Sequence, residues 1–172
     1  LGGNVRGIST LAMLPHIQNG DVLVLELDSW QLQGFGDLRV SPDIAVFTNL
    51  MLDHQNYYPT MEEYFEDKAC IFRFQKEGSV LIAGADIEKK IVSSHPPILP
   101  VVPQPLPDSV KLSVIGEHNR ENASLARLAL HALHISYEKI DDLLSTFDAV
   151  DGRLQSRKWT DQQGNDRYGC EI

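Results

Sequence analysis

The sequence predicts an α/β fold with a mostly parallel sheet flanked by helices. Short apolar runs, each rich in β-branched residues, alternate along the chain with longer segments of helical periodicity. This alternation is typical of βαβ units, in which a helix connects two parallel strands. The length agrees with this fold, because 172 residues, 42% of them hydrophobic, are enough for one domain with a sizeable core.

The order of the elements follows from these patterns. Apolar runs predict strands at residues 22–27, 44–48, 79–83 and 111–115. Apolar periodicity predicts helices at residues 8–17, 61–75, 85–92, 119–134 and 137–146. Six prolines between positions 96 and 107 exclude a helix there, so residues 95–108 are expected to form an extended connection that adds at most an edge strand.

The end of the chain has a different pattern. Residues 153–160 and 167–172 flank the turn-forming sequence DQQGND, which predicts a β-hairpin. A hairpin after an α/β unit is either an edge extension of that unit or the start of a further domain. We expect residues 1–153 to belong to one central domain and residues 154–172 to begin a second.

The charge balance narrows the classes of partner. The formal net charge is −9, whereas nucleic acids and anionic membrane surfaces attract basic patches. The sequence contains neither an apolar run of membrane-spanning length nor a signal-peptide pattern. Its two cysteines, Cys70 and Cys170, form neither a metal-binding motif nor a disulfide framework. We therefore expect a cytoplasmic protein that binds neither nucleic acid nor membrane.

Polar side chains follow three of the predicted strands, where the carboxyl ends of parallel strands usually form a ligand site. They are Glu26, Asp28 and Ser29; Asn49, Asp53 and His54; and Glu117, His118 and Asn119. Carboxylate and imidazole groups suit a divalent cation that carries phosphate. A helix that starts after Gly116 favours a nearby anion or nucleotide. The alternative interpretation is that these are ordinary polar loop residues.

A lysine lies within the apolar stripe of the helix predicted at residues 61–75. The stripe consists of Met61, Tyr64, Phe65, Ile71 and Phe72, and Lys68 falls on the same face. Because an isolated buried ammonium is costly, Lys68 is expected to be paired, deprotonated or modified, or else to reach past the core edge into solvent. A deprotonated Lys68 could react with carbon dioxide to give a carbamate, which supplies two oxygens for a metal or phosphate site.

Four blocks, in this order, resemble the Mur ligase family, the ATP-dependent amide-forming enzymes of peptidoglycan synthesis. They are residues 2–5 (GGNV), 25–32 (LELDSWQL), 49–54 (NLMLDH) with 61–64 (MEEY) and Lys68, and 116–123 (GEHNRENA). Within the family, the resemblance is greatest to the enzymes that add D-glutamate. It implies a P-loop-type ATP-binding central domain at residues 1–153, incomplete at its N-terminus, and the truncated start of a C-terminal domain at residues 154–172.

The resemblance also implies roles for individual residues. Glu26, His54 and a carbamylated Lys68 would be magnesium ligands, and His54 and Lys68 would be catalytic. Asn119 and Asn122 would lie near the adenine of ATP with His118 close by, and Arg153 would approach the nucleotide. Asn4 and Ser29 would face the UDP-sugar substrate.

The reaction that the resemblance implies is the addition of D-glutamate to UDP-MurNAc-L-alanine through an acyl phosphate formed with ATP. Magnesium would neutralise the two anions that meet when the substrate carboxylate attacks the γ-phosphate. The implied partners are UDP-MurNAc-L-alanine, D-glutamate and ATP, together with the N- and C-terminal domains that the sequence lacks. Surface that those domains would cover could also drive self-association.

The sequence departs from the family pattern in several places. Asp28 and Trp30 replace serine and phenylalanine, Asn56-Tyr57-Tyr58 stands where the family usually has Asp-Arg-His, and Gly152 replaces histidine. No phosphate loop of the form GxxGKS/T occurs, so we expect the 172 residues alone to be inactive. Two alternatives stay open. One is a sister ligase, either another Mur enzyme or one of the folylpolyglutamate synthase type, and the other is a non-catalytic binding module.

Overall fold

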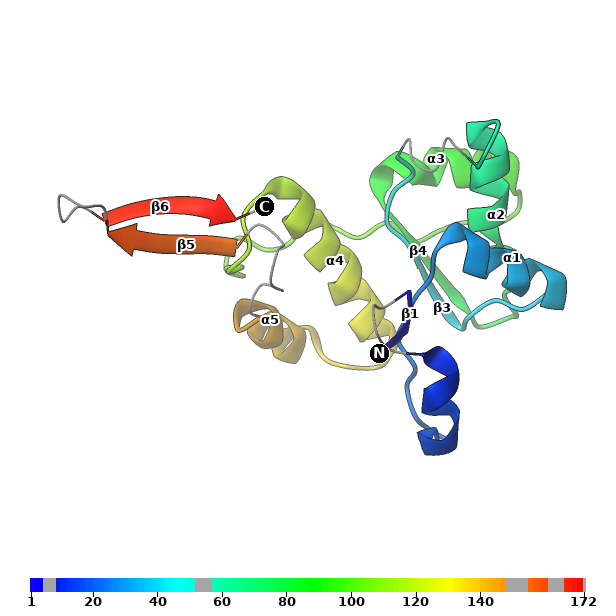
Figure 1. Cartoon of the computed structure of the whole chain (residues 1–172), viewed down its shortest axis with the longest axis horizontal. Helices are drawn as coiled ribbons and strands as arrows, with labels where there is room; N and C mark the ends of the chain where they lie inside the picture. The colour runs from blue at the N-terminus through cyan, green and yellow to red at the C-terminus, as the bar shows by residue number, and fades with distance from the viewer. Residues whose placement is uncertain (5–8, 52–56, 148–154, 161–165, 172) are drawn as a thin grey trace. The chain divides into compact units, whose positions relative to one another are not determined.

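The computed structural model describes residues 1–4, 9–51, 57–147, 155–160 and 166–171. The chain divides into two compact units, Leu1–Asp43 with Leu50–Gly78 and Ile44–Asn49 with Ser79–Ile172. Figure 1 labels most of the helices and strands of both units. Each unit combines a parallel strand pair with helices, which confirms the predicted α/β class.

The first unit contains a short pair of parallel strands. β1 (Gly2–Gly3) pairs with β2 (Leu25–Glu26), and Gly3 lies opposite Glu26. Between these strands, η1 (Thr10–His16) is a 3₁₀ helix, where the sequence pattern predicts an α-helix over residues 8–17. Pro15 lies inside η1, and a proline lacks the backbone N–H that the interior of an α-helix requires.

Two packed helices, α1 (Ser29–Leu38) and α2 (Met61–Arg73), follow in the first unit. The apolar pattern did not predict α1, although a capping box marks its start. Asp28 Oδ1 accepts from the backbone N–H of Gln31 at 2.8 Å, and Gln31 Oε1 accepts from the backbone N–H of Asp28 at 3.1 Å. The predicted helix α2 buries Tyr64, Phe65, Ala69, Cys70 and Phe72.

The second unit contains the parallel pair of β3 (Ile44–Phe47) and β4 (Val80–Ala83), both at predicted positions. Val101 bridges to β4: its carbonyl accepts from the N–H of Ala83 at 3.1 Å, and its N–H donates to the carbonyl of Leu81 at 2.8 Å. The proline-rich connection thus adds a short pairing at the edge of β4, as predicted.

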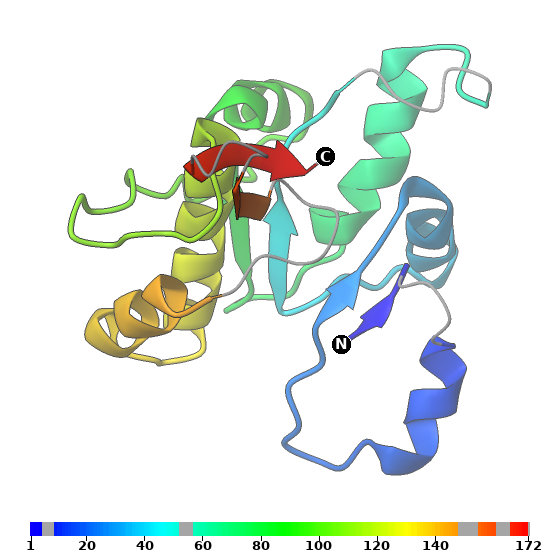
Figure 2. The ribbon, with the colours of Figure 1, turned by 60° about the vertical axis from the view of Figure 1, so that its left-hand side comes forward.

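Three predicted helices are present in the second unit: α3 (Ala85–Ser94), α4 (Glu117–Ala132) and α5 (Tyr137–Ser145). α4 packs against β3 and β4 and also against α5 (Figure 2). Beside α4, Leu106, Val110 and Ala123 form a buried apolar cluster, and Leu112 and Leu144 pack against it. This cluster fixes the segment that leads into α4.

Two of the predicted strands differ from the structure. Of residues 22–27, Leu25 and Glu26 pair in a strand, whereas Val22 and Val24 are exposed. The strand predicted at residues 111–115 is not among the strands of the described part of the chain, where Val114 alone of this segment takes part in a β-bridge. A β-branched run becomes a strand only beside a partner strand, and the run itself does not identify its partner.

The predicted terminal hairpin is present. β5 (Gln155–Thr160) and β6 (Asp166–Glu171) pair antiparallel, and the turn between them lies outside the described residues. The domain boundary at residue 153 stays a prediction. No helix in the described ranges is long and apolar enough to cross a membrane.

Candidate functional site

Asn4 and Glu26 are neighbours in the first unit. The backbone N–H of Asn4 donates to the carbonyl oxygen of Glu26 at 2.6 Å, and both residues are exposed. They lie at the carboxyl ends of two parallel strands, the edge at which α/β folds usually bind ligands. The structure therefore brings together a residue predicted to face the sugar substrate and a residue predicted to bind magnesium.

Ser29 begins α1 next to a polar cluster. Its side chain is buried, and its hydroxyl has no hydrogen-bond partner of good geometry among the described residues. The nearby Tyr58 hydroxyl donates to Asp67 Oδ2 at 2.9 Å, and Gln33 Nε2 donates to the same oxygen at 2.6 Å. Burial raises the pKa of Tyr58 to about 12; the Asp67 carboxylate also raises this pKa, whereas the Ser29 side chain lowers it. Ser29 is thus buried near the α1–α2 contact, and its substrate role stays a prediction.

Lys68 lies half-buried on α2, one turn after Tyr64. Its Nζ is 5.0 Å from the centroid of the Tyr64 ring, a distance at which a cation is attracted to an aromatic face. Lys68 therefore lies at the edge of the apolar face of α2. It is neither fully buried nor fully exposed, the two positions considered from the sequence. Its carbamylation stays a prediction.

His118, Asn119 and Asn122 lie in the first two turns of α4, in the second unit. Asn119 Nδ2 donates to the carbonyl oxygen of Ile115 at 2.7 Å, while His118 and Asn122 are exposed. Gly116 is the N-cap residue and supplies no side-chain cap. A pocket at this end of the helix is lined by Lys111, Leu112, Val114, Gly116, Glu117 and Arg120. The lining combines apolar residues with the cations Lys111 and Arg120 and the carboxylate Glu117, at a helix N-terminus, where backbone N–H groups favour an anion.

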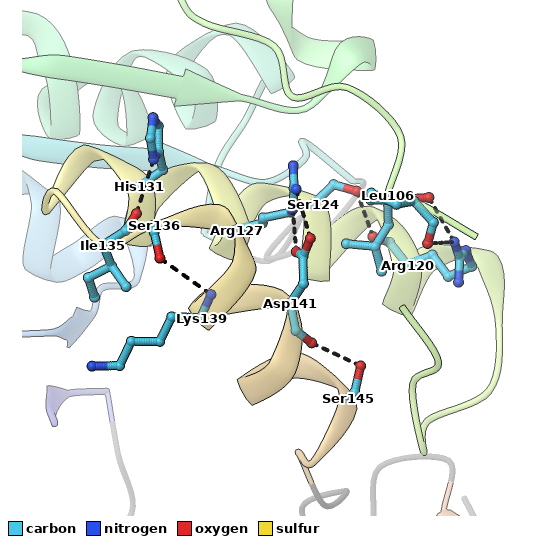
Figure 3. A network of polar contacts seen from close by, with 11 residues as sticks. Leu106, Arg120, Ser124, Arg127, His131, Ile135, Ser136, Lys139, Asp141 and Ser145 are labelled. Carbon is cyan, nitrogen blue, oxygen red and sulfur yellow. Dashed lines mark hydrogen bonds and ion pairs between the residues drawn. The ribbon is translucent and has the colours of Figure 1, made fainter. Parts of the chain in front are cut away.

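The middle of α4 is joined to α5 by an ion pair, drawn in Figure 3. Arg127 Nε and Nη2 donate to Asp141 Oδ1 and Oδ2 at 2.6 and 2.9 Å. The hydrogen bonds from Arg127 lower the pKa of Asp141, and the same contact raises the pKa of Arg127. Arg127 also lies over the Tyr137 ring, and His131 stacks on that ring. These groups hold α5 against α4.

The structure describes two of the three predicted magnesium ligands, Glu26 and Lys68. In the part of the chain that the structure describes, no three His, Cys, Asp or Glu side chains are close enough to hold a metal ion. His54 lies outside the described residues, as does the predicted nucleotide-side residue Arg153. Glu26 and Lys68 both belong to the first unit. The magnesium site stays a prediction.

Two residues of structural importance near these candidate sites were not identified from the sequence. Asp67 on α2 accepts one hydrogen bond from Gln33 of α1 and one from Tyr58, which precedes α2. Arg120 lies within the GEHNRENA block. A charged residue on a helix face normally indicates a solvated surface, so neither residue gives a distinctive signal by itself. Arg120 could have been identified only by its position within the GEHNRENA block, next to Asn119.

Comparison with known proteins identifies the class. A family model described as the Mur ligase middle domain matches residues 6–97, more than half of the chain. The chain belongs to the Mur ligase family. This confirms the resemblance that the four sequence blocks indicate.

Curated relatives carry the name UDP-N-acetylmuramoylalanine–D-glutamate ligase. The protein of Borreliella burgdorferi strain ZS7 is 43% identical over 82 residues, which are 48% of this chain and 18% of the relative. The protein of Lawsonia intracellularis is 33% identical over 134 residues, 78% of this chain and 30% of the relative. The protein of Leuconostoc mesenteroides is 28% identical over 174 residues, 89% of this chain and 38% of the relative. The chain thus spans well under half the length of these relatives.

Proposed function

We propose that this chain is the nucleotide-binding middle part of a ligase that adds D-glutamate to UDP-MurNAc-L-alanine. The observation that carries the proposal is that relatives named as D-glutamate ligases align with most of the chain. The close placement of Asn4 and Glu26 and the pocket at the start of α4 support it. The alternative of a sister ligase has no comparable support from these names.

The proposed reaction has two steps. The substrate carboxylate attacks the γ-phosphorus of ATP, which forms an acyl phosphate and releases ADP. The amine of D-glutamate then attacks the acyl carbon, which forms the amide and releases phosphate and a proton. Both reactants of the first step are anions, so the site has to neutralise charge before they can meet.

Different parts of the chain would serve the two sides of this reaction. In the second unit, His118, Asn119 and Asn122 would bind the adenine side of ATP. In the first unit, Asn4 and Ser29 would serve the UDP-sugar side. Glu26, His54 and a carbamylated Lys68 offer oxygen and nitrogen ligands of the type that magnesium accepts, and bound magnesium would supply the charge neutralisation. Arg153 would approach the nucleotide.

The 172 residues alone are proposed to bind nucleotide without turning it over. The sequence contains no GxxGKS/T phosphate loop, whose backbone N–H groups and lysine would hold the β- and γ-phosphates. A non-catalytic module is therefore the expected behaviour of the isolated chain, while the longer ligase would be the active, cytoplasmic enzyme.

A chimera tests the proposed function. In the Lawsonia intracellularis relative, the aligned segment is replaced by the corresponding residues of this chain, so that the relative supplies everything else. We expect D-glutamate-dependent amide formation and phosphate release. Lys68→Arg should reduce the rate at least about a hundredfold, since loss of one group that stabilises charge in the transition state has this magnitude. Lys89→Arg, at an exposed position on α3, is the matched control and should leave the rate unchanged.

Two outcomes of the chimera experiment would contradict the proposal. A folded chimera that binds ATP but forms no D-glutamate amide contradicts the proposed substrate. Equal activity of the Lys68→Arg and Lys89→Arg variants contradicts the proposed role of Lys68. Carbon-13 NMR in labelled bicarbonate provides a separate measurement, because a lysine carbamate gives a carbonyl signal that Lys68→Arg should remove.

A further inference from the structure

Arg120, in the first turns of α4, contacts three carbonyl groups of the preceding loop. Its Nη2 donates to the carbonyl oxygen of Leu106 at 2.9 Å and to that of Pro107 at 3.4 Å. Its Nη1 donates to the carbonyl oxygen of Val110 at 3.3 Å. Figure 3 shows Arg120 directed toward this loop, away from the Arg127–Asp141 ion pair. The guanidinium thus satisfies backbone acceptors on a turn that lies ten or more residues earlier in the chain.

The loop is fixed where Arg120 holds it. The N–H of Val110 donates to the carbonyl of Pro107 at 3.0 Å, which closes a tight turn. Leu106 and Val110 are buried against Ala123, one helical turn after Arg120. Polar and apolar contacts therefore hold the same end of the loop to the same part of α4.

The segment between this loop and α4 is also held at its other end. The N–H groups of Asn119 and Arg120 donate to the carbonyl of Gly116, at 3.1 and 3.4 Å. Asn119 Nδ2 donates to the carbonyl of Ile115 at 2.7 Å. Residues 111–115 consequently connect two anchored points although they form none of the described strands. Arg120 supplies one of these anchors by its side chain and takes part in the other by its backbone.

This tied segment is the wall of the pocket described above. Lys111, Leu112 and Val114 come from the segment, Gly116 and Glu117 from the start of α4, and Arg120 itself completes the lining. Other contacts also hold this wall: Leu112 packs against the apolar cluster, Ser113 Oγ donates to the carbonyl of Phe147, and Asn119 Nδ2 donates to the carbonyl of Ile115. The hydrogen bonds from Arg120 are the ones that join the preceding loop to the start of α4 through a charged side chain. The planar guanidinium of an arginine presents several N–H donors in a fixed arrangement, so it can donate to several carbonyls at once. The ammonium of a lysine does not provide this arrangement.

We propose that Arg120 is a positioning residue that holds the wall of the nucleotide pocket in its binding geometry. The inference rests on the proposed function for the identity of the ligand, an adenine nucleotide. Arg120 acts through residues 111–116 and the side chain of Asn119, by holding them at the start of α4.

A matched control lies on the same helix. Arg127 also joins α4 to another segment through its guanidinium, but its partner is Asp141 on α5, and it is seven positions further from the pocket. Arg127→Met therefore removes a comparable tie whose partners, Asp141 and the Tyr137 ring, do not line the pocket. Arg120→Met removes the guanidinium and its hydrogen bonds, and Arg120→Lys keeps the positive charge but not the guanidinium.

The experiment compares the 172-residue chain with these three variants by urea unfolding, amide hydrogen exchange and NMR titration with magnesium-ATP. Arg120→Met and Arg120→Lys should both accelerate exchange at residues 111–119 and weaken ATP binding about tenfold, the loss expected if the pocket wall then keeps its binding geometry about a tenth of the time. Arg127→Met should change ATP affinity less than about twofold at a similar loss of stability. Its faster exchange should be confined to α5 and the part of α4 that faces it.

Three outcomes would overturn the inference. Unchanged exchange at residues 111–119 in Arg120→Met would show that Arg120 does not hold the wall. Wild-type ATP affinity in Arg120→Lys would show that the positive charge at position 120 acts on the nucleotide, and that the guanidinium hydrogen bonds to the loop do not matter for binding. Equal weakening of ATP binding by Arg120→Met and Arg127→Met would show a general loss of stability. A wild-type chain with normal exchange protection but no ATP binding would instead refute the nucleotide part of the proposed function, and with it the ligand assigned to Arg120.

Discussion

Gly3 illustrates how one residue without a side chain sets the geometry of a candidate site. Its φ is +91°, and a Cβ added there would lie 1.9 Å from the carbonyl oxygen of Glu26. No side-chain rotation relieves a collision with backbone, so the close approach of β1 to β2 requires glycine. The placement of Asn4 next to Glu26 follows directly from this approach.

Substitution of Gly3 tests that requirement against a control with similar backbone strain. Gly20 also has a positive φ, +96°, but a Cβ there would meet nothing within 4 Å. Gly20→Ala should therefore cost about 1 kcal/mol, from φ strain alone. Gly3→Ala should cost clearly more and should shift the NMR signals of Asn4 and Glu26. Equal unfolding free energies in urea would contradict the proposed contact.

The Arg127–Asp141 pair makes stability depend on pH in a predictable direction. The hydrogen bonds from Arg127 lower the pKa of Asp141 below its ordinary value of 3.8. A carboxylate with a lowered folded-state pKa stabilises the folded state above the ordinary pKa, and this contribution is lost as pH falls through the folded-state value. Asp141→Asn should thus be less stable than wild type at pH 7, with a difference that shrinks below about pH 4.

Urea unfolding of the wild type and of Asp141→Asn at pH 7 and pH 3 checks this dependence. A difference that stays constant between the two pH values would show that the carboxylate charge does not contribute. Asp142→Asn, at the adjacent exposed position, is the control for a general change of charge.

At the scale of elements, the contact between α1 and α2 depends on a helix position where there is no space for a methyl group. A Cβ at Gly36 would lie 2.9 Å from Cys70 Sγ, whereas a Cβ at Gly34 would meet nothing within 4 Å. Gly34→Ala should stabilise the chain by about 0.5–1 kcal/mol, because alanine is the better helix former. Gly36→Ala should destabilise it by about 1–3 kcal/mol through overpacking.

Thermal unfolding of the two glycine variants distinguishes these effects, since helix propensity alone would raise Tm in both. A rise of similar size in both variants would contradict the close contact between Gly36 and Cys70. Gly36→Ala combined with Cys70→Ala should recover part of the loss if the contact causes it.

Prediction from sequence was accurate where an element carries its own signal. The helix at Met61–Arg73 has both an N-cap threonine and a regular apolar stripe, and it forms nearly as predicted. Helix α1 was missed because its two glycines obscure the helical pattern, although Asp28 and Gln31 form a readable capping box. The strand predicted at residues 111–115 is reduced to a β-bridge at Val114, because a strand needs a partner strand, which no local pattern reveals.

The candidate site residues show the same contrast between what local sequence predicts and what tertiary contacts determine. The order of the blocks in the sequence identified the family, and the parallel pairing of β1 with β2 places Asn4 by Glu26. Burial could not be predicted for Ser29, because it depends on packing near Tyr58 and α2, which lie about thirty residues away in the chain. The tie from Arg120 to the loop is likewise a tertiary contact and has no sequence signature.

At the scale of the whole molecule, an acidic chain is assigned to handle acidic substrates. With a formal net charge of −9, the chain offers no general attraction for nucleotides, so binding has to depend on local groups. In the proposed function these are the start of α4 and bound magnesium. The absence of a phosphate-loop motif from the 172 residues separates binding from turnover: the chain should hold the adenine side of ATP and leave the γ-phosphate intact.

The proposed nucleotide site at the start of α4 is tested most directly by an NMR titration of the 172-residue chain with magnesium-ATP, in parallel with an assay of released phosphate. We expect chemical-shift changes at residues 111–116 and at His118, Asn119 and Asn122, with no phosphate release above a control without protein. Absence of shifts at the start of α4, or saturable shifts confined to the first unit, would contradict the nucleotide site. Magnesium-dependent phosphate release from a preparation free of contaminating ATPases would contradict the predicted lack of turnover.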